Sequence, residues 1–155
     1  MTSQSAAPLA APGEQAPAGD IVLSVRNLRT HFWTKEGVVT AVRDVSFDVR
    51  QAEKVGIVGE SGCGKSALAL SVLGLIEPPG RVVGGEVWLN GRLISTLGDK
   101  EMGQVRGKEI SLIFQDPMTA LDPVKTIGEQ ITETILRHQE GVGKREARRR
   151  ATDLL

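Results

Sequence analysis

The chain has 155 residues, about the size of one domain, and 40% of them are hydrophobic, enough to supply a core. Its formal net charge of +0 argues against nucleic-acid binding through electrostatics alone, and an aromatic content of 3% argues against a stacking surface for single strands. No apolar stretch approaches the ~18 residues of a membrane-spanning helix, no secretory signal pattern opens the chain, and one cysteine permits no internal disulfide, so we expect a cytoplasmic protein.

The first part of the chain has the pattern of a tail followed by strands. Met1–Asp20 is rich in Ala, Pro, Gly, Ser and Gln and almost lacks large apolar side chains, so we expect a disordered tail. Strand patterns follow over Ile21–Val25 and Val38–Val49, and the second run ends in alternating apolar and polar residues. Glu36-Gly37 is predicted to turn the chain between them.

A strand, a glycine loop and a helix are predicted next. Lys54–Val58 is a β-branched run that suits a strand buried on both faces, and Ala67–Leu73 has a helical pattern. Between them, Gly59–Ser66 reads Gly-Glu-Ser-Gly-Cys-Gly-Lys-Ser and fits the phosphate-loop pattern G-x-x-x-x-G-K-[ST] at every fixed position. Nucleotide binding is therefore the first functional hypothesis, and a glycine turn with an incidental lysine is the alternative.

The residue types of this loop explain how it would hold a nucleotide. Glycines can adopt backbone angles that are closed to other residues, so successive N–H groups can converge on phosphate oxygens at the positive end of the helix. Lys65 would place its ammonium on the β and γ phosphates, and Ser66 would offer its hydroxyl to Mg²⁺. The predicted nucleotide contacts are Gly59, Glu60, Ser61, Gly62, Cys63, Gly64, Lys65, Ser66 and Ala67.

Beyond this helix, turn residues separate further short elements. Pro78-Pro79-Gly80 stops regular structure, and Gly85–Leu89 followed by Asn90-Gly91 is typical of a strand entering a hairpin turn. The polar stretch Gly98–Lys108 is expected to contain a short helix, and Ile110–Phe114 has strand character.

The last third is predicted to be helical. Gln115-Asp116-Pro117 ends the preceding strand because proline cannot donate to a ladder. Thr126–His138 is expected to form one helix and Lys144–Leu155 a second, separated by Gly141–Gly143. The apolar residues of the first helix recur every four positions, as on one helical face: Ile127, Ile131 and Ile135.

Several of these motifs together resemble one family. From Ile21 to Leu155 the sequence resembles the ATP-binding subunit of ABC transporters, most closely the oligopeptide and dipeptide importer branch. The segments that carry the resemblance are Ala41–Phe47, Gly59–Ser66, Ile113–Pro123 and Thr126–Ile131. The resemblance implies an α/β fold: a P-loop NTPase core with an N-terminal antiparallel β region and the start of a helical subdomain, as an incomplete ABC ATPase domain over residues 21–155.

The resemblance also assigns roles to residues outside the loop. Gln115 resembles the glutamine that reaches Mg²⁺ and the attacking water, and a polar residue that merely closes a strand is the alternative. Phe32 is favoured as the aromatic that stacks on adenine, with Trp33 as its competitor and simple packing as the alternative for either. Pro117–Pro123 would lie where the family docks the cytoplasmic helices of its membrane subunits.

The function implied is that of an energy-coupling subunit, which uses ATP and Mg²⁺ to import peptides or a related solute. Its partners would be transmembrane permease subunits, a second ATP-binding subunit and, indirectly, a solute-binding protein, with no nucleic acid, at the cytoplasmic face of the membrane. The chain has no Leu-Ser-Gly-Gly-Gln signature, no apolar strand ending in Asp-Glu and no later switch histidine. We therefore expect this chain to bind ATP weakly or not at all and not to turn it over, whereas the complete subunit would hydrolyse it.

Two alternatives from other classes remain. In the first alternative, the chain is a truncated, catalytically silent nucleotide-binding module. In the second, it belongs to a soluble ABC-type ATPase that acts on nucleic acid or ribosomes. Phe114–Ile131 and the lack of net positive charge count against the second.

A few reactive or charged residues are assigned no function. Cys63 is interpreted as a small side chain at a variable loop position, with a redox switch as the alternative. His31 and His138 have no metal-ligand spacing and are interpreted as surface or packing residues. A basic cluster near the C-terminus favours a solvated face or a subunit contact: Arg145, Arg148, Arg149 and Arg150.

Overall fold

The structure is a computed structural model that describes residues 19–116 and 121–155. The chain divides into two compact units, Met1–Gly98 and Asp99–Leu155. The predicted tail lies outside the described residues except for Gly19 and Asp20. The carbonyl oxygen of Asp20 accepts a hydrogen bond from the amide of Gln51 at 2.8 Å.

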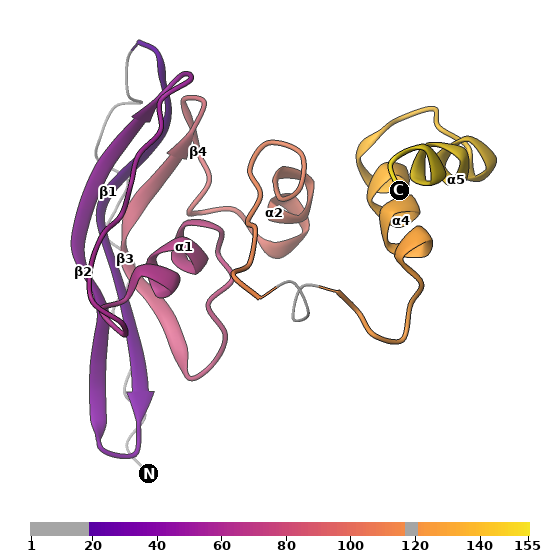
Figure 1. Ribbon diagram of the computed structural model, residues 1–155. Coiled ribbons are helices and arrows are strands. Elements are labelled where there is room, and N and C mark those ends of the chain that lie inside the picture. The colour runs from indigo at the N-terminus through magenta and orange to yellow at the C-terminus, as the bar shows by residue number, and fades with distance from the viewer. Residues whose placement is uncertain (1–18, 117–120) are drawn as a thin grey trace. The chain divides into compact units, whose positions relative to one another are not determined.

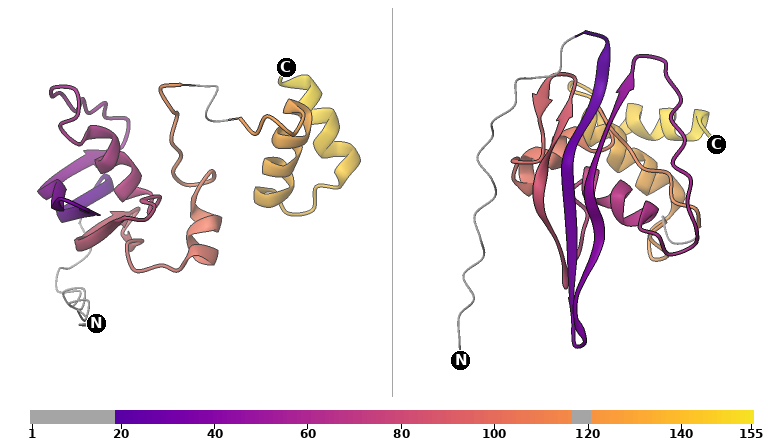
Figure 2. Two further views of the ribbon diagram at one scale, coloured as in Figure 1. Left: turned by 90° about the horizontal axis from the view of Figure 1, so that it is seen from below. Right: turned by 90° about the vertical axis from the view of Figure 1, so that its left-hand side faces the viewer.

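A four-stranded antiparallel sheet forms most of the first unit. Its strands are β1 (Ile21–Thr34), β2 (Gly37–Arg50), β3 (Gly80–Leu89) and β4 (Arg92–Leu93), in the spatial order β2-β1-β3-β4. Figures 1 and 2 show β1 and β2 as a long twisted hairpin. The predicted antiparallel β region and its hairpin turn at Asn90-Gly91 are confirmed. The turn predicted at Glu36-Gly37 lies one residue earlier, at Lys35-Glu36, because Gly37 already pairs with Thr34 as the first residue of β2.

The core of the sheet is built from apolar residues at matching register positions. Val25 of β1 lies opposite Phe47 of β2 and Val87 of β3, and both valines are fully buried. Leu28, next to a register shift in β1, is also fully buried. Because three strands contribute to this layer, the central strand β1 is fixed on both edges and provides a firm platform for the helix that follows.

The helix α1 (Lys65–Val72) packs against this sheet and begins two residues before the predicted start (Figure 1). Leu68 and Val72 are buried on its inner side. The hydroxyl of Ser71 donates to the carbonyl oxygen of Ala67, so the hydroxyl of Thr30 in β1 must donate to Ser71, at 2.7 Å. A buried hydroxyl pair thus joins the helix to the central strand.

The two strands predicted for the buried core are wrong for this structure. Lys54–Val58 is irregular and unpaired among the described residues, and Val58 is 95% exposed. Ile110–Phe114 is also irregular apart from one parallel bridge between Arg106 and Ile110, and Ile113 is 94% exposed. A strand that is apolar on both faces is stable only with strands beside it and layers above and below, and neither run has them here.

The second unit is helical, as expected from the sequence. Its helices are α2 (Asp99–Val105), α4 (Ile127–His138) and α5 (Lys144–Asp153). The pair α4 and α5 is packed around a small apolar core: Ile135, Ala147 and Ala151, with Ile131, Leu136 and Val142 at its margin. None of the helices in the described residues is long and apolar enough to cross a membrane.

The start of α4 is fixed by its own side chains. The hydroxyl of Thr126 accepts from the amide of Glu129 at 3.2 Å, and the carboxylate of Glu129 accepts from the amide of Thr126 at 2.9 Å. This reciprocal capping box satisfies two donors that a helix start leaves unpaired. The preceding residues are held by Gln130, whose side-chain nitrogen donates to the carbonyl oxygens of Asp122 and Lys125 and whose side-chain oxygen accepts from the amide of Asp122.

Candidate functional site

The loop Gly59–Ser66 curls at the N-terminus of α1, and its glycines permit the curl. Gly62 and Gly64 have φ angles of 79° and 100°, values that residues with a side chain rarely adopt. A Cβ atom on Gly64 would lie 2.3 Å from the carbonyl oxygen of Ala41 in β2. Gly64 therefore allows both the backbone angle and the close approach of the loop to the sheet.

Lys65 folds back over the loop that precedes it. Its ammonium donates to the carbonyl oxygens of Gly59 and Glu60, each at 2.7 Å, and lies 3.6 Å from the sulfur of Cys63. The positive charge is thus held inside the curl of the loop, at the first residue of α1. Neutral carbonyl oxygens are weaker partners for an ammonium than ionised oxygens, so a phosphate oxygen arriving here would compete well for it.

The N-terminus of α1 adds to this positive character. The amides of Lys65, Ser66 and Ala67 have no carbonyl acceptor within the helix, as in every first turn, whereas the amide of Leu68 already donates to Gly64 at 2.8 Å. The first turn contains no acidic residue, and Gly64 provides no side-chain cap. The start of α1 therefore offers three backbone donors, the positive end of the helix dipole and one ammonium, which is the kind of donor set that a polyphosphate requires.

The remaining loop residues are accessible. Glu60, Ser61 and Cys63 are exposed, and so is Ser66, whose hydroxyl is a suitable oxygen ligand for Mg²⁺ once phosphate oxygens are present. A Cβ atom on Gly59 would lie 2.6 Å from the sulfur of Cys63, so the Cys63 side chain lies against the backbone of Gly59 and leaves no room for a side chain there. The residues present thus fit a magnesium nucleotide.

Phe32 lies in the same unit as the loop, but part of its ring is packed against neighbouring residues of the sheet. It pairs with Val39 of β2 and Gly80 of β3, and a Cβ atom on Gly80 would lie 2.5 Å from its ring. Trp33 is more open, with 45% exposure, and its ring is tilted against His31 at a centroid distance of 6.1 Å. The ring of Phe32 is half-buried, and its stacking on adenine stays a prediction.

Gln115 belongs to the second unit, where it lies exposed at a bend after Phe114. Its role at Mg²⁺ also stays a prediction. Of the predicted docking segment Pro117–Pro123, the first four residues lie outside the described residues, and Leu121 is 45% exposed.

Sequence reasoning missed three residues that support the two candidate regions. The carbonyl oxygen of Ala41 lies close to Gly64 of the loop, and the hydroxyl of Ser71 is hydrogen-bonded to Thr30 of the sheet. Gln130 fastens the segment before α4 to that helix. The first two depend on contacts between distant parts of the chain, so no local signal reveals them. The third has a weak signal, because a glutamine four residues after a helix cap lies one turn above it.

Comparisons with known proteins agree with this geometry. Residues 42–155 match the family model described as "ABC transporter". The probable peptide ABC transporter ATP-binding protein y4tR of Sinorhizobium fredii is 47% identical over 140 residues, which are 90% of this chain and 42% of that protein. The dipeptide transport ATP-binding protein DppD of Bacillus subtilis is 47% identical over 135 residues, which are 86% of this chain and 40% of that protein.

The chain therefore spans about two fifths of the length of these curated relatives. Among solved structures, the ATP-binding cassette MJ0796, described as a dimer in a post-hydrolysis state bound to ADP and Pi, matches with a TM-score of 0.71 and 25% identity. That match covers 84% of this chain and 54% of the cassette. The predicted resemblance and the predicted fold class, a partial ABC ATPase domain, are confirmed by these matches. The chain belongs to the ABC transporter family.

Proposed function

We propose that this chain binds magnesium ATP as part of the energy-coupling subunit of a transporter that imports dipeptides, oligopeptides or a related solute. The observation that carries the proposal is the Lys65 ammonium held on the carbonyl oxygens of the loop at the start of α1, where the first-turn amides lack acceptors within the helix. The solute class is supported by relatives that are named for peptide and dipeptide transport.

The residues of the loop would act by binding and orienting the nucleotide. Lys65 exchanges its two carbonyl partners for phosphate oxygens, so the loop opens without losing a partner for its charge. The amides of Lys65, Ser66 and Ala67 would donate to the same phosphates, and the hydroxyl of Ser66 would hold Mg²⁺. When bound, Mg²⁺ neutralises phosphate charge that would otherwise repel a nucleophile.

Residues outside the loop would complete the site in the whole subunit. We propose that Gln115 contacts Mg²⁺ and the attacking water, and that Phe32 stacks on adenine after a side-chain rearrangement. Residues 21–155 would form the N-terminal part of the ATP-binding domain, preceded by a tail at 1–20. The partners would be permease subunits, a second ATP-binding subunit and, indirectly, a solute-binding protein, at the cytoplasmic face of the membrane.

We further propose that this chain alone binds nucleotide weakly and does not turn it over. None of its 155 residues belongs to a Leu-Ser-Gly-Gly-Gln signature or to an apolar strand ending in Asp-Glu. Phosphoryl transfer to water needs an oriented nucleophile in addition to charge neutralisation, and the loop supplies only the second. Sustained ATP hydrolysis by the purified chain, abolished by Lys65→Ala, would contradict this part of the proposal.

Calorimetric titration with magnesium ATP tests the binding site. We expect Lys65→Ala to weaken binding about ten- to hundredfold, since a hydrogen bond to a charged group contributes ~1.5–3 kcal/mol. Lys35→Ala removes the same charge from the exposed turn between β1 and β2 and should leave the affinity unchanged. Equal affinities for both variants would refute the assignment.

A further inference from the structure

The ring of Phe32 lies directly over a glycine of the neighbouring strand. Phe32 in β1 pairs with Gly80, the first residue of β3. A Cβ atom on Gly80 would lie 2.5 Å from Cε1 and 2.9 Å from Cδ1 of the ring. Opposite residues of an antiparallel pair project their side chains to the same face of the sheet, so a side chain at position 80 would occupy the place of the ring. The missing side chain of Gly80 therefore decides where the ring can lie.

The backbone around Gly80 holds this glycine in place beneath the ring. Its amide donates to the carbonyl oxygen of Glu77 at 2.8 Å, and the amide of Trp33 donates to the carbonyl oxygen of Pro79 at 3.1 Å. The Cγ2 atom of Ile76 lies 2.7 Å from the same Cβ position, so Ile76 also covers the glycine. A larger residue at position 80 would therefore displace side chains and not the backbone.

The ring lies on the face of the sheet that carries α1. Thr30 precedes Phe32 by two residues, and β1 pairs with β3 without a register shift from Thr30 to Phe32. Side chains two residues apart in a strand project to the same face. Because the hydroxyl of Thr30 is hydrogen-bonded to Ser71 of α1 at 2.7 Å, that face is the one under α1. Phe32 is half-buried there, so part of its ring stays open.

The phosphate loop reaches the sheet close to this ring. Gly64 of the loop approaches the carbonyl oxygen of Ala41, and the neighbours of Ala41 in β2 pair with Thr30 and His31. The loop therefore meets the sheet within two residues of the register position of Phe32. A nucleotide whose phosphates bind the loop has its base held at a reach limited by its own bonds, so the base cannot freely follow a displaced ring.

We propose that Gly80 is a positioning residue for Phe32, an inference that rests on the proposed function, in which Phe32 stacks on adenine. Because Gly80 has no side chain, the ring has room to lie against the backbone and to turn towards a base. A methyl group at this position would displace the ring by about 1 Å before an ordinary carbon–carbon contact is restored. Gly80 would thus act on the base of the nucleotide through Phe32 and leave the phosphate contacts of the loop unchanged.

A purely structural role for the pair makes a different prediction. An aromatic ring that covers a glycine can stabilise a sheet without contacting any ligand. Gly80→Ala would then lower the stability, but the affinities for a nucleotide and for a polyphosphate without a base would change by the same factor. The ratio of these two affinities therefore separates a positioning role from a structural one.

Calorimetric titration of the whole chain with magnesium ATP and with magnesium tripolyphosphate measures this ratio. We expect Phe32→Ala to lower the ratio about five- to hundredfold, as for the loss of one base–aromatic stacking contact. Gly80→Ala should lower it about two- to tenfold, because a displaced ring loses part of its dispersion contact with the base. The double variant Phe32→Ala/Gly80→Ala should have the ratio of Phe32→Ala, because the added methyl group then has no ring to displace.

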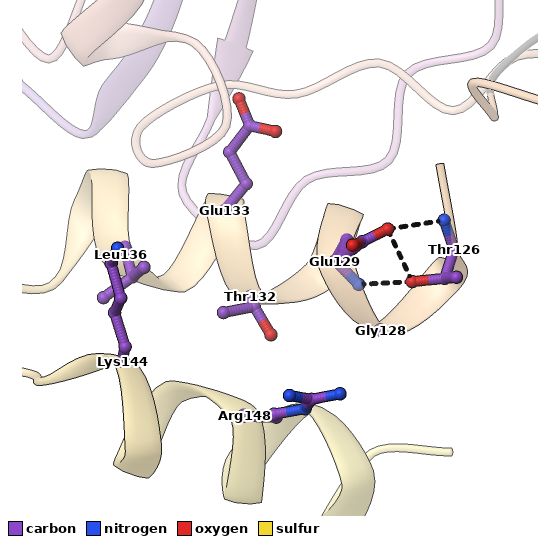
Figure 3. Close-up of a pocket in the computed structure, with 8 residues that line it drawn as sticks. All are labelled: Thr126, Gly128, Glu129, Thr132, Glu133, Leu136, Lys144 and Arg148. Carbon is purple, nitrogen blue, oxygen red and sulfur yellow. Dashed lines mark hydrogen bonds between the residues drawn. The ribbon is translucent and has the colours of Figure 1, made fainter. Parts of the chain in front are cut away.

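Two other glycines provide matched controls. Gly84→Ala adds a methyl group to the same strand, where a Cβ atom would lie 2.9 Å from the guanidinium of Arg29, the end of a flexible and partly exposed side chain. Gly128→Ala adds one in the first turn of α4, in the other unit (Figure 3), where a Cβ atom would meet nothing within 4 Å. Neither control should change the affinity ratio more than about twofold.

Far-UV circular dichroism and thermal melts check that each variant is folded. Should Gly80→Ala not fold, the double variant Ile76→Ala/Gly80→Ala removes the second side chain over the glycine and should lower the ratio relative to Ile76→Ala alone. The inference is overturned if Gly80→Ala leaves the ratio unchanged while Phe32→Ala lowers it, or if Gly80→Ala lowers it further when the Phe32 ring is absent. An unchanged ratio in Phe32→Ala would refute the proposed stacking and this inference with it, so the two failures are distinguishable.

Discussion

Replacing Gly64 by alanine tests how firmly the phosphate loop is fixed to the sheet. The matched control is Gly62→Ala, because both glycines have positive φ angles, 79° at Gly62 and 100° at Gly64. A Cβ atom on Gly62 would meet nothing within 4 Å, whereas one on Gly64 would lie 2.3 Å from the carbonyl oxygen of Ala41. The two substitutions therefore share the backbone strain and differ in the clash.

The expected costs follow from this difference. A left-handed backbone angle costs a residue with a side chain about 1–2 kcal/mol, so Gly62→Ala should lower the free energy of unfolding by that amount. Gly64→Ala adds an overpacking cost of about 1–3 kcal/mol, because the atom it meets belongs to the backbone and cannot rotate away.

Urea unfolding followed by tryptophan fluorescence measures both costs. Trp33 and Trp88 lie in β1 and β3 of the same unit, so their emission reports the unfolding of the sheet that holds the loop. Gly64→Ala should also weaken magnesium ATP binding more than Gly62→Ala. Equal destabilisation by the two variants would refute the claim that Gly64 is fixed against β2.

Three further predictions concern the helical unit and the exposed apolar runs. Gln130→Ala removes three hydrogen bonds to residues 122–125 and should lower the free energy of unfolding by about 1–2 kcal/mol in thermal melts, whereas an unchanged melting temperature would show that the clamp does not contribute. Hydrogen bonds from Arg149 and Arg150 lower the pKa of Glu146 to about 2, so these contacts stabilise α5 above the unfolded pKa of Glu146, and the stabilisation is lost as the pH falls towards 2. The helicity should therefore drop in that pH range, and Glu146→Gln should remove that part of the drop. The purified chain should aggregate through residues such as Val58 and Ile113, which are 95% and 94% exposed. Val58→Lys should therefore reduce light scattering. A monomeric wild-type chain that melts cooperatively would contradict this prediction.

Local patterns predicted the parts of the fold that depend on local contacts. Alternation over Val38–Val49, the Asn90-Gly91 turn and the helix predicted over Thr126–His138 each involve neighbours within a few residues or one hairpin partner. The runs at Lys54–Val58 and Ile110–Phe114 failed because a buried strand depends on partners elsewhere in the sheet.

The candidate site divides in the same way. The amides, Lys65 and Ser66 lie within one continuous segment, so a sequence pattern alone selects them, and their contact with phosphate stays a prediction. The approach of Gly64 to Ala41 depends on where β2 lies relative to α1, and no sequence pattern reveals that distance. The roles of Phe32 and Gln115 require a base or a metal ion held at a distance along the chain from their own positions, so they stay predictions.

The most direct test of the account follows the backbone amide signals of Lys65, Ser66 and Ala67 by NMR during titration with magnesium ATP. The account predicts that all three shift saturably with one dissociation constant, because their N–H groups donate to phosphate oxygens at the start of α1. The account would be contradicted if these three signals did not move at saturating nucleotide. It would also be contradicted if the only signals that moved were those of Lys144 and Arg148 in the helical unit.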